Sequence, residues 1–341
     1  RPSRDMLASE PGDRMIMYRV ADGSVAWSKS LKYQGPPLLH GDTIFTQTQA
    51  FEMLTGDPLM RTNPITGIEA PWTLKRMYGC NTIIASEYLL TFRSGAAGFC
   101  DLTGDGATGN LGGFKSGCTS NLIVADGVLN APDYTRTCTC SYQNQTSLAL
   151  IHMPEVEMWT FNSFGLGDDA IRRVGLNLGA PGDRRASSGT TWLDYPSTGG
   201  SSPDPEVTTV PAKPALFRRH SSRISGDGLR WVGASGAIDL REIAVRLAPE
   251  GAAARSYTVN LYFAEPDDLA PSQRVFDVAV QGRAALSGFD IAHEADTPRT
   301  VISRSVADVT VTDVLTVKLA PTAGQKKPPV LCGIEAVAQG W

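Results

Sequence analysis

Aromatic and polar side chains that could hold a sugar occur together in two short stretches. Trp192, Asp194 and Tyr195 lie within four residues of one another, and Arg219 follows Phe217 by two residues. An aromatic ring can pack on the C–H face of a pyranose, while charged groups bind its hydroxyls. These five residues are therefore candidate carbohydrate-binding residues. The competing interpretation is that Trp192 and Phe217 lie in a hydrophobic core, where such residues are common.

Five of the six cysteines lie close together in the first half of the chain: Cys80, Cys100, Cys118, Cys138 and Cys140. Cys332 stands alone near the end. Cys138 and Cys140 would place both sulfurs on one face of a strand, within reach of a neighbouring strand. We expect disulfides among the five, and hence a location outside the cytoplasm. The alternatives are buried thiols and a zinc site, although the sequence has no C-x-x-C pair.

A short acidic stretch matches the first half of a calcium-binding loop. Asp101, Thr103 and Asp105 provide oxygens at the first, third and fifth positions, but Gly112 stands at the twelfth, where a bidentate Glu is needed. A turn between strands is the favoured interpretation, and calcium held by these residues would bind weakly.

The sequence contains none of the common catalytic motifs. The G-x-S-x-G, H-E-x-x-H and P-loop patterns do not occur, and the four histidines are scattered along the chain. We therefore expect a protein that is not an enzyme.

Charge and hydropathy exclude two further classes of protein. The net charge of −4 leaves no broad basic surface for nucleic acid, and no apolar run reaches the 18 residues or so that cross a bilayer.

The elements that position these residues are strands. Short runs rich in β-branched and aromatic residues alternate with turn residues throughout the chain, which is typical of an all-β protein. Three similar hairpins are predicted around Gly41, Ser86 and Asp126, at spacings of 45 and 40 residues. Trp27 and Trp72 are also 45 residues apart. A period of this length indicates β-propeller blades.

The Gly turns before these tryptophans carry a resemblance. Asp22-Gly23-Ser24-Val25-Ala26-Trp27 and Thr66-Gly67-Ile68-Glu69-Ala70-Pro71-Trp72, each followed by a hairpin, resemble the quinoprotein (PQQ-like) propeller repeats over about residues 11–160. The resemblance implies three to four blades, whereas a ring closes with about 4–8. We expect upstream sequence or oligomerisation to complete the ring. The chain lacks the adjacent cysteines of the quinone-dependent dehydrogenases of that family, so no quinone is predicted.

A change of composition near residue 165 predicts two domains, residues 1–164 and 165–341. In the second, alternating strands are expected at 257–263 and 274–280, followed by a hairpin around Thr312-Asp313 and a closing strand at 330–337. Strands spaced in this way without helices predict an antiparallel sandwich.

Several motifs in this half occur in the order of the malectin-like domain. They include Val174-Gly175-Leu176-Asn177-Leu178-Gly179, Tyr262-Phe263-Ala264-Glu265, Arg274-Val275-Phe276-Asp277-Val278 and Val330-Leu331-Cys332-Gly333-Ile334-Glu335. The resemblance implies a jelly-roll sandwich that binds carbohydrate, with Tyr195 and Phe217 near the family's aromatic sugar contacts. Two stretches depart from the pattern of the sugar-binding members, Pro266-Asp267-Asp268 and Gln325-Lys326-Lys327, so a different sugar specificity is expected.

Together these features predict an exported, non-catalytic scaffold or binding protein. The propeller would provide a platform for protein partners, and the sandwich would bind a glycan. The alternatives are the C-terminal part of a quinone- or haem-dependent redox enzyme, or a purely structural surface protein.

Overall fold

The computed structural model is all-β and divides into two compact units. It describes residues 6–8, 14–104, 108–111, 114, 122–132, 147–151, 153, 156–162, 164–200, 202–295 and 297–340. The first unit comprises Arg1–Asn63 and Ile68–Phe164, and the second comprises Pro64–Gly67 and Gly165–Trp341. Among the described residues, helix is limited to α1 (Arg230–Gly233), α2 (Ile291–Glu294) and a 3-10 turn at Ser221–Arg223. No helix in these ranges is long and apolar enough to cross a membrane.

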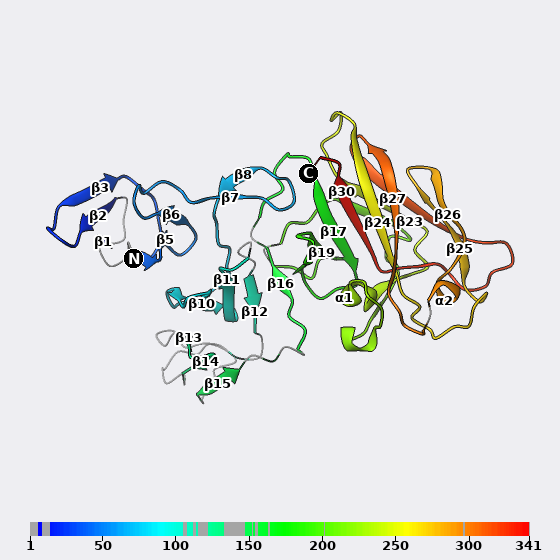
Figure 1. The fold of residues 1–341 in the computed structure, drawn as a ribbon, viewed down its shortest axis with the longest axis horizontal. Coiled ribbons are helices and arrows are strands. Elements are labelled where there is room, and N and C mark those ends of the chain that lie inside the picture. The colour runs from blue at the N-terminus through cyan, green and yellow to red at the C-terminus, as the bar shows by residue number, and fades with distance from the viewer. Residues whose placement is uncertain are drawn as a thin grey trace. The chain divides into compact units, whose positions relative to one another are not determined.

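The second unit is a sandwich of two large sheets (Figure 1). The six-stranded sheet has the order β18 (Arg184–Arg185), β19 (Thr191–Tyr195), β17 (Arg173–Leu178), β30 (Gly333–Ala338), β24 (Arg255–Phe263) and β27 (Ile302–Val311). The five-stranded sheet has the order β20 (Val207–Val210), β23 (Glu242–Arg246), β28 (Val314–Pro321), β25 (Val275–Val280) and β26 (Arg283–Asp290). A smaller sheet joins β21 (Ala215–Arg218), β22 (Ser235–Ile238) and β29 (Val330–Leu331).

One hydrophobic core fills the space between the two large sheets. Alternate residues of β24 and β28, such as Val259, Leu261 and Val317, have no exposed surface. Three phenylalanines meet near the end of β24: Phe263 lies 4.8 Å from Phe289 and 6.0 Å from Phe276 between ring centroids. Burying this apolar surface is the main force that holds the sheets together.

The predicted hairpin around Thr312-Asp313 is wrong. β27 and β28 flank this turn, but they belong to opposite sheets, so the chain crosses from one sheet to the other. The Asp313 carbonyl accepts hydrogen bonds from the backbone N–H groups of Leu247 and Ala248, at 2.7 and 3.1 Å. The alternation of apolar residues was compatible with both arrangements, because strands of either sheet turn one face toward the same core.

The first unit is built from small antiparallel sheets. They are β1 (Met6–Ala8), β2 (Met15–Arg19) and β3 (Val25–Lys29); β4 (Leu38–His40), β5 (Thr43–Phe45) and β6 (Ala50–Glu52); β7 (Met60–Thr62) and β8 (Glu69–Pro71); and β13 (Ile123–Ala125), β14 (Val128–Ala131) and β15 (Leu148–Ile151). A five-stranded sheet has the order β16 (Thr160–Phe161), β12 (Thr108–Asn110), β11 (Ala96–Asp101), β10 (Leu89–Ser94) and β9 (Ile84–Ala85).

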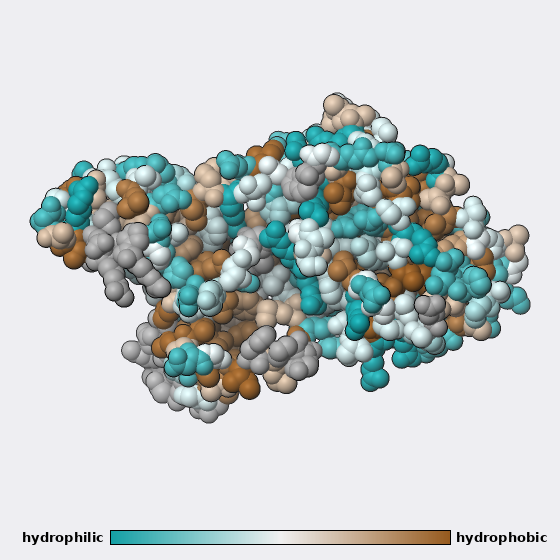
Figure 2. All heavy atoms as spheres, in the orientation of Figure 1, coloured by the Kyte–Doolittle hydropathy of each residue, from teal (hydrophilic) through white to brown (hydrophobic). Residues whose placement is uncertain are grey.

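All three predicted hairpins are confirmed, as β4–β5, β9–β10 and β13–β14. Their assignment to propeller blades stays a prediction. Figure 2 shows hydrophobic residues gathered over the part of this unit that carries β13–β15, where Ile123 and Ile151 are exposed.

The cysteines that the structure describes form no disulfide with one another. Cys80 is exposed, with its sulfur 3.1 Å from the Tyr78 hydroxyl, and Cys100 is buried in β11. Cys332 is buried in the core of the second unit, where desolvation raises the pKa of its thiol to about 12. The other three predicted disulfide candidates, Cys118, Cys138 and Cys140, lie outside the described residues.

Candidate functional site

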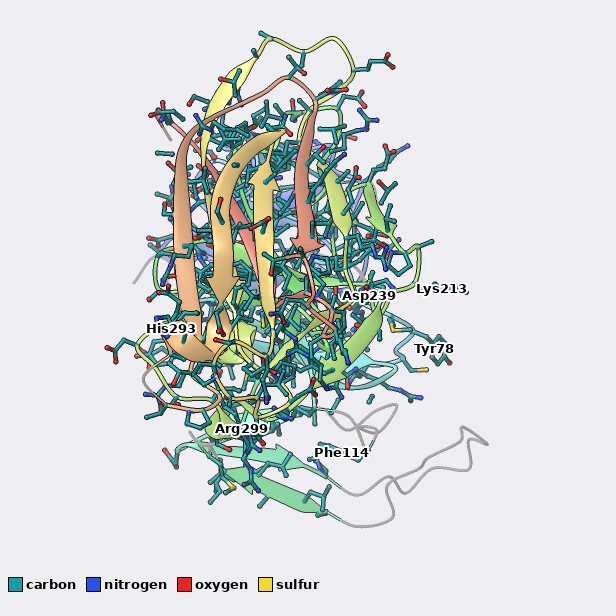
Figure 3. The ribbon with its side chains drawn as sticks, turned by 90° about the vertical axis from the view of Figure 1, so that its right-hand side faces the viewer. Tyr78, Phe114, Lys213, Asp239, His293 and Arg299 are labelled. Carbon is teal, nitrogen blue, oxygen red and sulfur yellow. The ribbon has the colours of Figure 1, made fainter. Side chains whose placement is uncertain are left out.

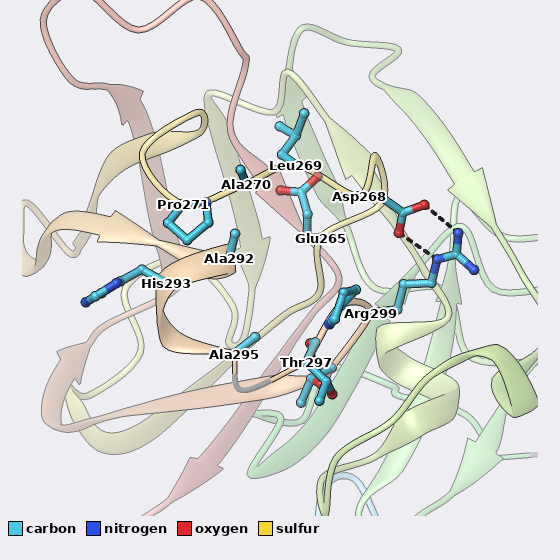
Figure 4. A pocket seen from close by; sticks show the side chains of 12 residues that line it. Glu265, Asp268, Leu269, Ala270, Pro271, Ala292, His293, Ala295, Thr297 and Arg299 are labelled. Atoms are coloured by element: carbon cyan, nitrogen blue, oxygen red, sulfur yellow. Dashed lines mark hydrogen bonds and ion pairs between the residues drawn. The ribbon is translucent and has the colours of Figure 1, made fainter.

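The second unit contains a pocket of about 540 Å³. Two loops line it (Figure 4). The first loop, after β24, contributes residues 265 and 268–271, and the second, which begins in α2 and leads toward β27, contributes residues 292, 293, 295 and 297–300. Figure 3 shows His293 and Arg299, both from the second loop, at one end of the sandwich strands. Small apolar side chains such as Ala270, Ala292 and Ala295 share the lining with charged ones.

A buried ion-pair cluster holds the first loop. Arg274, directly before β25, donates from Nη1 to Glu265 Oε1 and from Nη2 to Asp267 Oδ2, the latter at 2.7 Å. The Asp267 backbone N–H also donates to Glu265 Oε1, at 2.9 Å. Arg274 and Glu265 are 1% and 5% exposed. Removing one member of such a buried pair is strongly destabilising, because the charge left behind has no partner.

A second ion pair joins the two loops that line the pocket. Arg299 donates from Nε to Asp268 Oδ1 at 2.8 Å and from Nη2 to Asp268 Oδ2 at 2.5 Å (Figure 4). The hydrogen bond from Arg299 lowers the pKa of Asp268, with further contributions from the charges of Arg299 and Arg219. Both residues of the pair have left-handed backbone conformations, with φ of 53° at Asp268 and 59° at Arg299. Such conformations are uncommon outside glycine, so the two-point ion pair fixes otherwise disfavoured turns.

Asp290 links the same two loops through hydrogen bonds to their backbones. Its Oδ1 accepts hydrogen bonds from the backbone N–H groups of Ala292 and His293 at 3.0 and 3.2 Å, which caps α2. Its Oδ2 accepts one from the backbone N–H of Ser272. The carboxylate therefore orders the start of the second loop and the end of the first.

Two of the residues predicted from sequence are part of the framework of the sandwich. Trp192 has no exposed surface, and its ring makes edge contacts with Trp231 and Tyr262 at centroid distances of 5.6 and 5.1 Å. Asp194 is 5% exposed, and its Oδ2 accepts hydrogen bonds from the backbone N–H and hydroxyl of Thr198. These contacts give Trp192 a core role and give Asp194 the task of ordering the loop after β19.

The other three predicted residues are half-buried, and the structure brings two of them to one place. Gly179, just after β17, donates from its N–H to the Tyr195 carbonyl at 2.7 Å. An added Cβ at this glycine would lie 3.2 Å from the Phe217 carbonyl oxygen, so the two backbones flank the same point. Arg219 reaches further and donates from Nη2 to the carbonyl of Pro266, in the first pocket loop. Its charge contributes to the lowered pKa of Asp268.

The calcium prediction falls in a turn of the first unit. The Thr103 N–H and hydroxyl donate to Asp101 Oδ1 at 2.8 and 2.7 Å, which closes the turn after β11. Asp105 lies outside the described residues. Within the described part of the chain, no three metal-ligating side chains gather.

Sequence reasoning missed the pocket itself. In the sequence, Glu265 belongs to a malectin-like motif and Asp268 to a stretch that departs from the pattern, and neither they nor Arg299 carry a signal for a pocket. Asp268 pairs with Arg299, 31 positions further along the chain. The two residues meet because the chain returns to the end of β24 after β26 and α2, which local sequence patterns do not reveal.

Comparison with known proteins gives a family match within this unit. Among curated proteins no match was found. Similar solved structures include a β-glucuronidase of Bacteroides uniformis, with 12% identity, a TM-score of 0.36, and coverage of 49% of this chain and 18% of that chain. They also include the ANX2 ectodomain from Arabidopsis thaliana, with 19% identity, a TM-score of 0.34, and coverage of 49% and 42%. The ANX1 ectodomain from the same plant has 16% identity, a TM-score of 0.34, and coverage of 58% and 59%.

The chain spans less than two thirds of each of these solved chains. Both pocket loops lie between β24 and β27, in the middle of the second unit's sequence. Residues 251–328, which contain these loops, match the family described as the Malectin domain, so this part of the second unit is malectin-like.

Proposed function

We propose that the second unit is a non-catalytic carbohydrate-binding module. Its ligand would lie at the sandwich end formed by the two pocket loops and by Tyr195 and Phe217, which we call the rim. The observation that carries this proposal is the match of residues 251–328 to the Malectin domain, because that stretch supplies the whole described pocket lining. The pocket's volume of about 540 Å³ lies within the range usual for small-ligand sites.

The side chains around the pocket support binding rather than proton transfer. Glu265 and Asp268 are both held in ion pairs with arginines. Such fixed carboxylates suit hydrogen bonding to hydroxyl groups, whereas a general acid or base must exchange a proton with the substrate. His293, the one histidine in the described lining, is exposed and points away from Arg299 in Figure 4.

The rim supplies the aromatic component. Tyr195 and Phe217 are half-buried and pack against the core, which would hold their rings still when a sugar stacks on them. Arg219, which binds Pro266, would place further N–H donors between this rim and the pocket. In this proposal Trp192 and Asp194 shape the site from beneath and do not contact the glycan.

Glycan-array screening followed by calorimetric titration tests the proposal. We expect the full chain to bind at least one glycan, and Tyr195→Ala and Phe217→Ala to weaken that binding about tenfold each, as the loss of a stacking ring would require. Tyr88→Ala, at an exposed tyrosine of the first unit, is the matched control and should bind normally. A chain that binds no glycan, or rim variants that bind as well as the control, would contradict the proposal.

We further propose that the first unit is a scaffold of propeller blades in an exported protein. The support is the 40–45-residue spacing of its three hairpins. Sequencing the complete open reading frame tests both points, because further repeats of the same period and an export signal are expected there. A frame lacking either would contradict the corresponding point.

A further inference from the structure

The carboxylate of Glu265 has one oxygen that the protein does not use. Oε1 accepts hydrogen bonds from Arg274 and from the backbone of Asp267, whereas Oε2 is buried and has no hydrogen-bond partner. The residue is only 5% exposed, yet it lines the pocket. Figure 4 shows its carboxylate among the lining side chains, beside Leu269 and Ala270.

A buried acceptor without a donor is rare in folded proteins and is costly when it is charged. In Glu265, Arg274 binds Oε1 and thereby fixes the orientation of the whole carboxylate, so the side chain cannot turn to give Oε2 a hydrogen-bond donor. The unused oxygen can gain its missing hydrogen bond from a molecule that enters the pocket. It is therefore an acceptor already positioned for a ligand donor, and little ordering of the side chain would accompany binding.

The charges around this oxygen restrict the ligand. Glu265, Asp267 and Arg274 together carry two negative charges and one positive charge. Asp268 and Arg299 neutralise each other through a two-point ion pair, so this guanidinium is already engaged by a carboxylate. An anionic group placed beside Glu265 would meet a like charge at short range and no unengaged cation within the described lining to balance it.

Hydroxyl groups of the second loop, together with Ser225 behind them, favour a ligand with several hydroxyls. Thr297 Oγ1 and Thr300 Oγ1 lie 2.8 Å apart, and Ser225 Oγ lies 3.1 Å from Thr300 Oγ1. Thr300 Oγ1 donates to the Thr297 carbonyl at 2.7 Å, so these hydroxyls offer a ligand mainly oxygen lone pairs, which sugar hydroxyls can use as donors. The small side chains of Ala270, Ala292 and Ala295 share the pocket lining with Glu265 and the two threonines and take up little of its volume.

We propose that the pocket takes an uncharged sugar residue, one hydroxyl of which donates to Glu265 Oε2, and that it discriminates against sugars bearing a carboxylate. This inference rests on the proposed carbohydrate-binding function and assigns to it a ligand class and a specificity-determining residue. The aromatic rim would contribute stacking to any glycan, whereas Glu265 would select by charge.

The test compares neutral disaccharides with the matching disaccharides in which one residue is a uronate, by calorimetric titration of the full chain. We expect the neutral disaccharide to bind at least about tenfold more tightly than the uronate. Glu265→Gln should weaken binding of the neutral disaccharide by a similar factor and should reduce the affinity ratio between the neutral disaccharide and the uronate. Ala292→Leu fills the pocket without touching either ion pair and should abolish measurable binding. Ala253→Leu, the same change in the exposed loop before β24, is the control and should bind normally.

The outcomes separate the two proposals. If neutral glycans bind but Ala292→Leu has no effect, or if the uronate binds as tightly as the neutral sugar, the pocket assignment is overturned while carbohydrate binding stands. If Glu265→Gln fails to fold, which its circular dichroism would reveal, Ala292→Leu and the uronate comparison still decide. If no saccharide binds, both proposals fall.

Discussion

A single methyl group added beneath Trp192 should severely strain the second unit. Gly175 in β17 lies opposite Trp192 in β19, and a Cβ at this glycine would lie 2.1 Å from Trp192 Cδ2. Carbon atoms pack at about 3.5 Å or more, so the ring would have to move by over about 1 Å. The ring cannot move easily, because it has no exposed surface and Trp231 and Tyr262 pack against it. A Cβ at Gly333 would also reach within 2.8 Å of the same ring.

The expected cost follows from this geometry. Inserting a methyl group into a packed core costs about 1–3 kcal/mol, and the severity of the clash places Gly175→Ala near the upper end. For a unit of this size, a loss of about 3 kcal/mol lowers the melting temperature by about 6–12 °C. Gly165→Ala is the matched control, since a Cβ there meets no atom within 4 Å. It should change stability by no more than about 0.5–1 kcal/mol.

Differential scanning calorimetry of the full chain measures these differences, and a double-mutant cycle assigns their cause. Trp192→Phe alone should destabilise the unit by leaving a cavity. Combined with Gly175→Ala, the smaller ring should make room for the added methyl group, so the double variant should be more stable than the sum of the two losses predicts. Additive losses, or a Gly175→Ala variant as stable as Gly165→Ala, would refute the core role of Trp192.

Other predictions concern the charged and thiol groups. Arg299→Gln should raise the pKa of Asp268 toward its ordinary value of 3.8, and a carboxyl NMR titration would show it. A lowered carboxyl pKa stabilises the fold above the unfolded-state pKa, and this contribution is lost as pH falls through the folded-state pKa. The variant lacks this contribution, so its stability should fall less on acidification than that of the unmodified chain. An unchanged Asp268 titration would contradict the ion pair. Native alkylation followed by peptide mass spectrometry should label the exposed Cys80 and spare Cys332 until denaturant is added, and early labelling of Cys332 would contradict its burial. Arg274→Ala should destabilise the unit by about 3–5 kcal/mol in urea titrations, and a loss below about 1 kcal/mol would contradict the buried cluster.

Much of the strand content could be predicted because it depends on local patterns. The alternation in 257–263 and 274–280 identified β24 and β25, and the turn residues at Gly41 and Asp126 identified hairpins in the first unit. The sheet that the strand after Thr312-Asp313 joins could not be predicted from such local patterns. A two-residue turn can return the chain to the same sheet or carry it across the sandwich. The pairing of β28 with β23 and β25 selects the second outcome.

The same limit applies to Trp192. A tryptophan two residues before an aspartate has the composition of a sugar site and also that of a core strand. What distinguishes the two is the pair of glycines that form the surface under the ring, Gly175 and Gly333, which lie far apart in the sequence. Gly175 is part of a motif that was recognised by resemblance, but its partnership with Trp192 arises only when β17 and β19 pair in parallel.

The pocket depends on tertiary structure still more strongly, and this bears on how it would work. Its two loops are joined by the Asp268–Arg299 pair and by Asp290, so neither loop can move without breaking a charge-assisted hydrogen bond. A site held in this way loses little conformational entropy when a ligand binds. This matters most for the affinity of weakly bound, polar ligands such as sugars. The residues that departed from the pattern of sugar-binding relatives, Pro266-Asp267-Asp268, are thus the ones that anchor Arg219, Arg274 and Arg299. Under the proposed function, this stretch gives the site a rigid charged frame, and a change of ligand selectivity is the expected consequence.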